Sequence, residues 1–145
     1  GVAQWGRTLQ LSTRIGSRFP ALISATGRCV AAFGGHADAE IQAQFHHLRW
    51  DAPPSFEDWT HEVAETRSRG WAVDSGNYIA GVTVVAAPVR KTAQPPNHAL
   101  VAIGVGAAMH DGLTQLRRDL VAASRSLSAR LDNESRFATA PSNRS

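Results

Sequence analysis

Apolar and polar side chains alternate most clearly near the start of the chain. Leucine, threonine and isoleucine take every second position, and polar residues lie between them, in Leu9-Gln10-Leu11-Ser12-Thr13-Arg14-Ile15. Successive side chains of a strand point to opposite faces of a sheet, so this period of two indicates a strand with one buried face. Residues 2–5, which precede Gly6, are predicted to pair with it as a hairpin.

Two later segments, Val82–Val89 and Ala99–Val105, are rich in valine and almost continuously apolar. Such runs are typical of strands that are covered on both faces, so we expect them at the centre of the sheet. A short strand at Trp71–Asp74 precedes them. The polar link from Arg90 to His98 is predicted to be a hairpin loop.

Apolar spacings of three and four residues predict the helices. A short helix, Arg28–Phe33, is followed by Gly34-Gly35, and glycine suits the left-handed end of a helix. A second helix is capped by Asp38 and carries Ile41, Phe45 and Leu48 on one face. The third runs to Gly70 from a capping box formed by Ser55 and Asp58, and the last is a long amphipathic helix, Asp111–Leu131.

Helices on a mostly antiparallel sheet make an α+β fold. A chain of 145 residues with 43% hydrophobic content can bury one good core but not two, so we expect one domain, residues 1–131. The tail, residues 132–145, is polar and is predicted to be disordered.

Charge and cysteine content restrict the function classes. With 15 basic and 12 acidic residues the formal charge is only +3, which by itself is too small to indicate a nucleic-acid partner. A single cysteine cannot form an internal disulfide, and no charged segment followed by an apolar one opens the chain, so we expect a cytoplasmic protein. The longest nearly apolar run, Ala99–Met109, is too short to span a membrane, and no membrane partner is expected.

Enzyme chemistry is not predicted. Cys29 lies among alanines and valine, the usual setting of an inert buried thiol. His46 and His47 are adjacent, so on a helix they point about 100° apart and do not share a metal ion as an i, i+4 pair does. We therefore expect no catalytic residue, no metal and no cofactor.

Small residues at a helix start are the most informative feature. Ser24, Ala25, Thr26 and Gly27 stand where a strand leads into a helix, so unpaired backbone N–H groups can face a ligand without bulky side chains in the way. Such a helix end favours a carboxylate or another anion. The same residues also fit simple close packing, and this second interpretation stays open.

Several ordered segments carry a resemblance to a known family. They comprise Gly16, Pro20, Gly27-Arg28, Ala31-Ala32-Phe33, Arg67-Ser68-Arg69-Gly70-Trp71, Asp74, Gly81-Val82 and Ala86-Ala87-Pro88-Val89. From Leu9 to Leu131 the chain resembles the effector-binding domain of the IclR family of bacterial transcriptional regulators. The resemblance implies a GAF-like (profilin-like) fold, a homodimer or homotetramer, and DNA binding only through a winged helix-turn-helix domain that should precede Gly1.

The resemblance also implies an effector pocket. Its residues would be Leu11, Phe19, Ala25, Thr26, Gly27, Asp74, Val82, Val84, Gly104 and Gly106. The N–H groups of residues 25–27 would hold a carboxylate, the Thr26 hydroxyl could donate a further bond, and Asp74 could accept from a ligand hydroxyl or orient its own loop. Tyr78, in the 75–80 loop, is a candidate lid.

Departures from the family pattern predict the ligand class. Members that bind small keto acids place a cysteine and serines where this chain has Val84, Gly104 and Gly106. A small polar acid would leave its own groups unpaired there, at a cost of about 1–3 kcal/mol each. We therefore expect a larger, more apolar carboxylic acid, with an aromatic acid favoured. The two glycines also fit the close approach of a helix to the sheet, so their pocket role stays open.

A protein-interaction module is the alternative function. The exposed side of the last helix or the edge of the central sheet would then mediate oligomerisation, and no small-molecule effector would bind. An enclosed pocket at residues 25–27 would support sensing, whereas a filled core with an exposed apolar face would support assembly.

Overall fold

The computed structural model describes residues 3–5, 9–15, 22–96, 98–105 and 107–139, and the side chains of residues 22–96, 98–105 and 112–134. The strands are β1 (Ala3–Trp5), β2 (Leu9–Ile15), β3 (Ala72–Ser75), β4 (Val82–Val89) and β5 (His98–Val105). The helices are α1 (Ser24–Phe33), α2 (Asp38–Phe45), α3 (Phe56–Arg69) and α4 (Ala107–Thr139). The strands form one antiparallel sheet in the order β1-β2-β5-β4-β3, so the predicted α+β fold with a mostly antiparallel sheet is confirmed.

The two almost continuously apolar segments lie inside the sheet, as predicted. β5 is the middle strand, and β4 lies between β5 and β3. Strands in these places are hydrogen-bonded on both edges and packed on both faces, which explains why polar residues are rare in them. The polar link between β4 and β5 is a hairpin loop.

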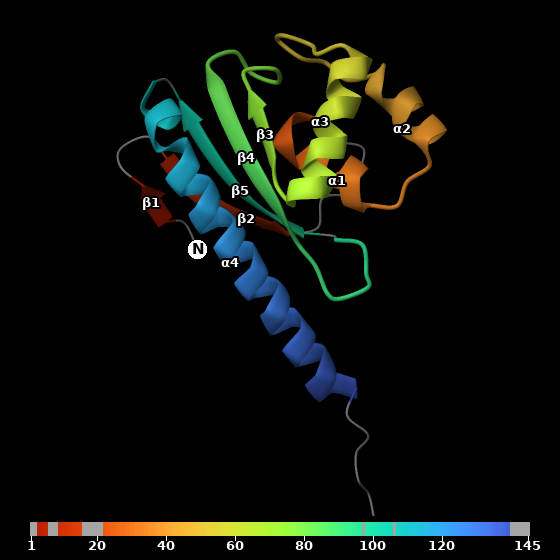
Figure 1. The fold of residues 1–145 in the computed structure, drawn as a ribbon, viewed down its shortest axis with the longest axis vertical. Coiled ribbons are helices and arrows are strands. Elements are labelled where there is room, and N and C mark those ends of the chain that lie inside the picture. Colours follow the sequence, from red (N-terminus) through yellow and green to blue (C-terminus); the bar gives the residue numbers. More distant parts are fainter. Residues whose placement is uncertain (1–2, 6–8, 16–21, 97, 106, 140–145) are drawn as a thin grey trace, which may run out of the picture.

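Each face of the sheet carries its own core. The helix α4 crosses one face, where Leu116 and Leu120 are almost completely buried against Val85, Leu100 and Ala102 (Figure 1). The helix α1 covers the other face, where Ala25 and Cys29 pack on Ala72, Val84, Ala86, Ala99 and Val101. Because side chains alternate along a strand, odd and even positions of β4 and β5 belong to different cores.

The helix α1 is packed on two sides. Its residues Ala31 and Ala32 join a further apolar cluster with Ile41 and Phe45 of α2 and Trp59 of α3. The molecule is therefore layered as α4, then the sheet, then α1, with α2 and α3 outermost (Figure 1). Since α1 contacts both the sheet and the outer helices, its small residues allow the close approach on each side.

The helix α1 begins at Ser24, four positions before the predicted start at Arg28. Serine, threonine and glycine are poor helix formers, and this is why the apolar spacing favoured the later start. Contact of Ala25 with the sheet overrides that preference. The N-cap is Ile23, which provides no side-chain hydrogen bond to the first turn.

The boundaries of α2 and α3 follow local signals to different degrees. The Asp58 N–H donates to the Ser55 hydroxyl at 3.0 Å, and Gly70 ends α3 with a φ of 89°, so the predicted cap and stop are both confirmed. In α2 the N-cap is Ala37 rather than Asp38, and the helix ends at Phe45, so Leu48 lies beyond it.

The last helix is longer than predicted at both ends. It continues to Thr139, so residues 132–139, where the polar composition predicted a disordered tail, are helical, and residues 140–145 lie outside the described residues. Both carboxylate oxygens of Asp132 accept hydrogen bonds from Thr92, which holds this part of the helix against the β4–β5 loop. Within the described part of the chain, no helix has the length and apolar character needed to cross a membrane.

Candidate functional site

The N-terminus of α1 lies over β3 and β4. Ala25 is completely buried there and packs with Val84 of β4, while Thr26 is half-buried. Asp74 of β3 pairs in register with Val84 and is also buried. The structure thus brings together Ala25, Asp74 and Val84, three of the residues that the sequence assigned to one site.

Ser24 is an unsatisfied polar residue at this helix start. It is 6% exposed, and no other described group makes a hydrogen bond with its hydroxyl oxygen. Its φ of 62° lies in the left-handed region, which costs a non-glycine residue about 1–3 kcal/mol. The sequence indicated Ser24 only as a small residue, because neither its strained backbone nor its missing partner can be read from residue type.

The free N–H groups of α1 differ from those predicted. The Gly27 N–H donates to the Ile23 carbonyl at 2.9 Å, so it closes the first helical turn and is not available to a ligand. By helix geometry, the N–H groups of Ser24, Ala25 and Thr26 precede the first intrahelical bond. The first turn has no acidic residue and no side-chain cap, so its positive end is not neutralised within α1.

Gly27 serves close packing instead. A Cβ atom built on Gly27 would lie 1.9 Å from the carbonyl carbon of Leu22. Only glycine lets the chain that enters α1 fold back against the first turn. The packing interpretation is therefore correct for Gly27 and for the side chain of Ala25, whereas the N–H groups of Ser24, Ala25 and Thr26 have no intrahelical acceptor.

An apolar surface continues past the helix start. Val84 pairs with Ile103, and Val82 pairs with Val105, so these four side chains share the face that α1 covers further along. Ile103 is 45% exposed and Val105 is 57% exposed. Val84 is buried, so the exposed apolar side chains on this face of β4 and β5 are those of Ile103 and Val105.

Asp74 is engaged with its own loop. Its carboxylate accepts hydrogen bonds from the N–H groups of Asn77 at 2.8 Å and of Tyr78 at 3.3 Å. The Asp51 and Ala52 N–H groups donate to the carbonyls of residues 78 and 77, which ties this loop to the segment before α3. Of the two roles expected for Asp74, orienting the loop is the one with visible contacts. The ring of Tyr78 is 38% exposed.

A buried arginine holds the same loop from the other side. Arg28 has no exposed surface; its Nε atom lies 2.6 Å from Glu62, its Nη1 atom 3.3 Å from Asp74, and its Nη2 atom donates to the Asn77 side chain at 3.1 Å. The sequence indicated Arg28 only as part of a motif. Its role depends on residues 34 and 49 positions away, which no local pattern connects.

Other predicted site residues are not brought to this place. Gly104 pairs with Thr83 and alternates with Ile103 and Val105, so it belongs to the register positions that face α4. Leu11 pairs with Ala102, which packs under α4, whereas Val101, under α1, pairs with Ser12. Phe19 and Gly106 lie outside the described residues.

Cys29 has the character of an inert thiol. It is 2% exposed, its Sγ atom lies 3.5 Å from the carbonyl oxygen of Ala86, and burial raises the pKa of the thiol to about 12. A thiol with this pKa stays protonated at neutral pH and is a poor nucleophile. Among the described residues, no three His, Cys, Asp or Glu side chains gather as a metal site would require.

Comparison with known proteins gives a consistent picture. Residues 4–129 match the family described as bacterial transcriptional regulator IclR C-terminal. No curated protein matches the chain. The fold is similar to that of a transcriptional regulator from Rhodococcus sp. RHA1, with a TM-score of 0.63 and 24% identity over 83% of this chain and 50% of that one.

Two further solved structures share the fold. An IclR transcriptional regulator from Alicyclobacillus acidocaldarius has a TM-score of 0.65 and 18% identity, over 88% of this chain and 58% of that chain. The inducer-binding domain of a double mutant of PobR from Acinetobacter, in complex with 3-hydroxybenzoic acid, has a TM-score of 0.57 and 12% identity, over 73% of this chain and 65% of that chain. The chain thus spans 50% of the Rhodococcus structure and 58% of the Alicyclobacillus structure. The proteins it is similar to are transcriptional regulators, not enzymes.

Proposed function

We propose, because this chain belongs to the family of bacterial transcriptional regulator IclR C-terminal domains, that it binds a small-molecule effector and couples this binding to the DNA affinity of a longer regulator. The DNA would be bound by a winged helix-turn-helix domain outside this sequence. Such a regulator works in the cytoplasm as a homodimer or homotetramer. The effector shifts the balance between two arrangements of the assembled domains by binding one arrangement more tightly.

The observation that supports the proposal is that polar groups in the first turn of α1 lack hydrogen-bond partners. The buried Ser24 hydroxyl has no hydrogen-bond partner among the described groups, and the N–H groups of Ala25 and Thr26 precede the first intrahelical bond. A carboxylate placed there would accept from these donors and meet the positive end of the helix dipole. An unpaired buried hydroxyl is costly, and a ligand would remove that cost.

The apolar surface beside Ser24 supports an aromatic or another large apolar acid. Val82, Val84, Ile103 and Val105 offer no hydrogen bond to a small keto acid, but they suit the face of a ring. PobR, which shares the fold, has been seen with 3-hydroxybenzoic acid, and this agrees with the ligand class. Asp74 and Arg28 would hold the loop that carries Tyr78, which remains a candidate lid.

The remaining predicted contacts stay predictions. Thr26 would add its hydroxyl to the carboxylate site. Contacts from Leu11, Phe19, Gly104 and Gly106 would require residues that lie outside the described part or at register positions facing α4.

The test is a thermal-shift and calorimetric comparison of benzoate with benzyl alcohol, which has a similar ring without the charge, and with glyoxylate. A ligand that binds only the folded protein, at 100 times its dissociation constant, adds about 2.7 kcal/mol to stability. We expect this gain for benzoate and not for the other two. Replacing Ser24 with alanine should weaken benzoate by about tenfold, the loss of one hydrogen bond to a charged group.

Two further variants complete the design. Ser68→Ala removes a hydroxyl from an exposed position of α3 and should leave benzoate affinity unchanged. Thr26→Phe, at a half-buried position of the same helical turn, should abolish benzoate binding because it fills the site. Equal affinity in Ser24→Ala and Ser68→Ala would contradict the proposal.

An oligomerisation module remains the second candidate, and the exposure of Ile103 and Val105 favours it specifically. In that case the apolar surface meets another copy of the chain instead of a ligand. Ile103→Asp would then lower the sedimentation coefficient, and no acid in the series would stabilise the protein. With an effector site, the same variant would weaken benzoate without changing the oligomeric state.

A further inference from the structure

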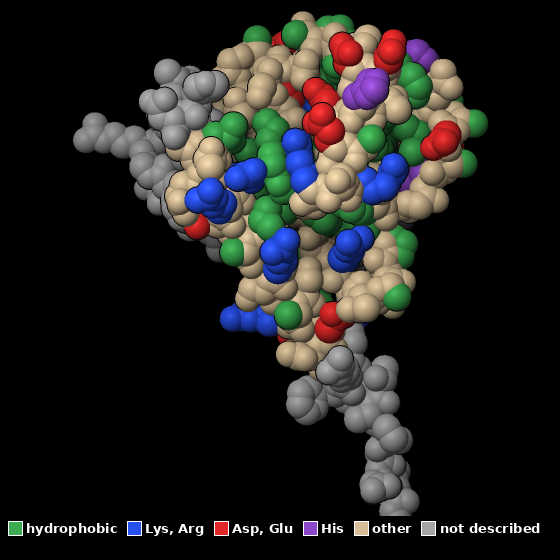
Figure 2. Space-filling view, viewed as in Figure 1, with side chains coloured by type: hydrophobic (Ala, Val, Ile, Leu, Met, Phe, Trp, Pro, Cys, Tyr) green, Lys and Arg blue, Asp and Glu red, His purple; other side chains and the backbone are tan. Residues whose placement is uncertain are grey.

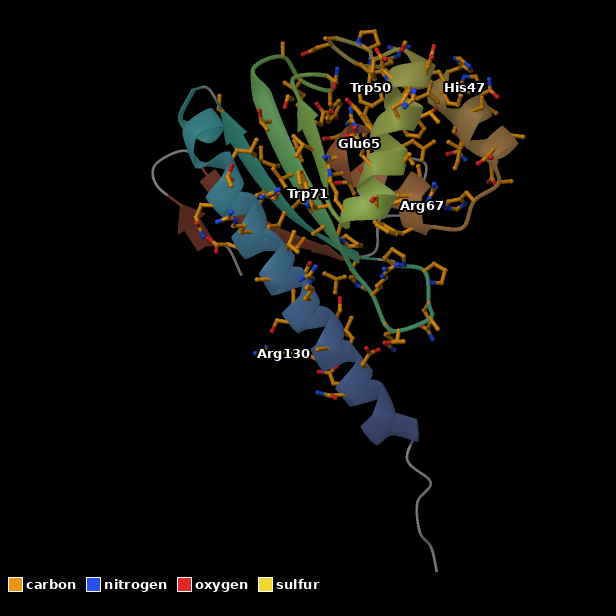
Figure 3. The ribbon with its side chains drawn as sticks, viewed as in Figure 1. His47, Trp50, Glu65, Arg67, Trp71 and Arg130 are labelled. Carbon is orange, nitrogen blue, oxygen red and sulfur yellow. The ribbon has the colours of Figure 1, made fainter. Side chains whose placement is uncertain are left out.

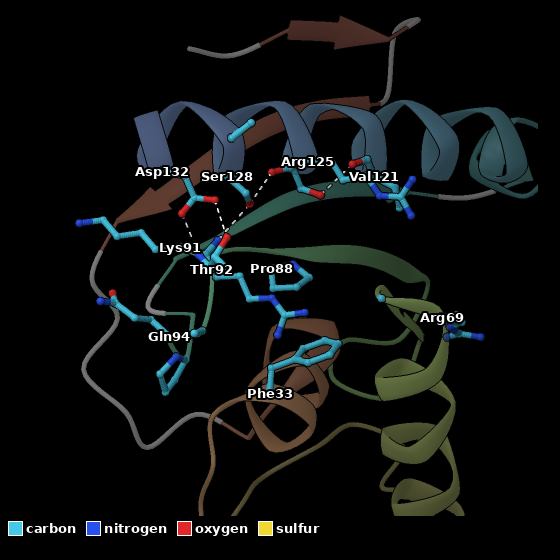
Figure 4. A pocket seen from close by; sticks show the side chains of 16 residues that line it. Phe33, Arg69, Pro88, Lys91, Thr92, Gln94, Val121, Arg125, Ser128 and Asp132 are labelled. Carbon is cyan, nitrogen blue, oxygen red and sulfur yellow. Dashed lines mark hydrogen bonds between the residues drawn. The ribbon is translucent and has the colours of Figure 1, made fainter. Parts of the chain in front are cut away.

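A large cavity lies at the opposite end of α1 from Ser24. It is open to solvent, has a volume of about 830 Å³ and is bounded by α4, the β4–β5 loop and the C-terminal ends of α1 and α3 (Figure 4). None of the residues predicted for the effector site lines it. The cavity therefore needs its own explanation.

The lining of this cavity is strongly cationic. Arg69, Arg90, Lys91 and Arg125 line it, and Asp132 is the one acidic residue among the described residues of its lining. Asp132 is already occupied, because the Thr92 N–H and hydroxyl donate to its two oxygens at 2.8 Å and 2.7 Å. Among the residues that the structure describes, no carboxylate forms an ion pair with Arg90, Lys91 or Arg125.

Arg69 adds to the positive charge without being neutralised. Its nearest carboxylate, that of Glu65, lies 3.6 Å away and is 66% exposed, so water screens this pair. The guanidinium stacks on the ring of Trp71 at 3.7 Å, and Arg117 approaches the same ring at 4.7 Å. Trp71 lies between α3 and α4 (Figure 3). Lys and Arg side chains surround a hydrophobic strip between these helices (Figure 2).

The cavity walls are held in place before any ligand arrives. The Arg90 N–H donates to the Ser128 hydroxyl at 3.1 Å, and with the Thr92 contacts this fastens the β4–β5 loop to α4. The Arg90 guanidinium stacks on the ring of Phe33 at 4.8 Å, which keeps it at the cavity wall. Loop ordering would therefore cost little on binding.

The apolar part of the lining defines the body of the ligand. Phe33, Pro88, Pro95 and Val121 contribute apolar surface between the cations. Arginine pairs with phosphate or carboxylate oxygens through two parallel hydrogen bonds, and lysine adds a point charge. A ligand with an apolar body and two negative charges would match both the apolar and the cationic residues of the lining.

We infer that this cavity is a second ligand site, for a small organic dianion of the phosphate-ester or dicarboxylate class. It is separate from the effector site at Ser24. The cations come from α3, from the β4–β5 loop and from α4, and they line one hollow together with apolar side chains. A nucleic-acid backbone is better matched by a row of cations along an open surface, so we favour a small molecule.

The experiment is calorimetric titration of this chain with phenyl phosphate and with phthalate. Benzyl alcohol, which has the ring but no charge, and inorganic phosphate, which has the charge but no ring, are the control compounds. Both dianions should bind more tightly than either control compound. Arg125→Gln and Arg90→Gln should each raise the dissociation constant of phenyl phosphate by about tenfold, as expected for the loss of a charge-assisted contact.

Matched controls test whether the effect is local. Arg118→Gln and Arg130→Gln remove the same charge from exposed positions of α4 that do not line the cavity, and Arg130 lies on the side turned away from the β4–β5 loop (Figure 3). These variants should bind phenyl phosphate like the unaltered chain. Ser24→Ala should bind it equally well, which separates this site from the effector site.

Three outcomes would overturn the inference. One is the absence of binding by both dianions in the folded chain, and another is an equal loss of affinity in the control variants. The third is a short DNA duplex that displaces phenyl phosphate and loses affinity in all four arginine variants, which would identify a general polyanion surface. Circular dichroism of each variant shows that it has folded.

Discussion

At the residue scale, the buried side chain of Arg28 connects three polar residues from different parts of the chain. It places one fully buried positive charge beside Glu62 and Asp74 and also donates to Asn77. Glu62 is 39% exposed, so much of its charge is screened, whereas Asp74 is 1% exposed. The buried partner Asp74 therefore depends on Arg28 more than Glu62 does.

Replacing Arg28 with methionine should destabilise the protein by about 3–5 kcal/mol, because Asp74 then remains buried with its charge unpaired. Urea denaturation measures this loss. Arg49→Met, at an exposed position, should cost less than about 0.5 kcal/mol. The double variant Arg28→Met with Asp74→Asn should be more stable than the sum of the two single losses predicts; strict additivity would rule out the coupling.

The Cys29 thiol makes the stability depend on pH in the alkaline range. Burial raises its pKa from 9.0 to about 12, so above pH 9 the unfolded chain loses this proton while the folded protein keeps it. The stability contribution is complete below pH 9 and is lost as the pH rises toward 12, at up to about 1.4 kcal/mol per pH unit. The comparison is between the original chain and Cys29→Ala, in urea denaturation at pH 8, 9 and 10. Parallel stability curves for the two proteins would exclude this account.

At the element scale, the start of α1 shows how tertiary contacts decide what local preference does not. Ser24 to Gly27 are poor helix formers, yet they form the first turn because Ala25 packs on the sheet and Gly27 fits against Leu22. The apolar spacing correctly located the body of the helix. It could not locate the first turn, where the reason for helix formation lies in residues distant in sequence.

Two glycine-to-alanine variants separate these effects. Gly27→Ala should cost more than about 2 kcal/mol and abolish effector binding, because its Cβ would overlap the Leu22 backbone. Gly112→Ala, within α4, has no atom within 4 Å of the new Cβ and should stabilise the protein by up to about 1 kcal/mol through helix propensity. Thermal unfolding of both variants gives the comparison, and a loss of stability in both would contradict it.

The β4–β5 loop offers a test of the contact with α4. Asp132→Ala removes both acceptors for Thr92, so the Thr92 amide hydrogen should exchange with solvent at least about tenfold faster. Asp119→Ala, which removes an acceptor of Gln115 on the same helix, should leave Thr92 unchanged. Hydrogen exchange followed by NMR measures both. If the two variants behave alike, Asp132 does not fasten the loop.

At the scale of the whole molecule, the sequence predicted the fold class, all the strands and the central position of β4 and β5. The alternation in β2, the apolar runs and the Ser55 cap are local signals that survive in the structure. The face of each strand was harder to predict. Runs that are apolar at every position carry no alternation, so nothing in them indicated that Val84 faces α1 while Gly104 belongs to the register facing α4.

Part of the candidate site followed from the family resemblance, which placed Ala25 and Val84 together, and these two residues do pack together. Residue type alone did not link them. The unpaired hydroxyl of Ser24 and the buried charge of Arg28 arise from contacts across many residues, and the cationic cavity arises from four elements that meet only after folding. None of these leaves a pattern along the chain.

One rigid element reaches both proposed sites. The ten residues of α1, about 15 Å long, have Ser24 at one end and Phe33, a lining residue of the cationic cavity, at the other. Held between the sheet and the outer helices, such a helix can move along its axis only as a unit. A carboxylic acid that binds at Ser24 and shifts α1 would therefore also shift Phe33 at the cationic cavity. Binding at either site would then change the ligand affinity of the other site by the same factor.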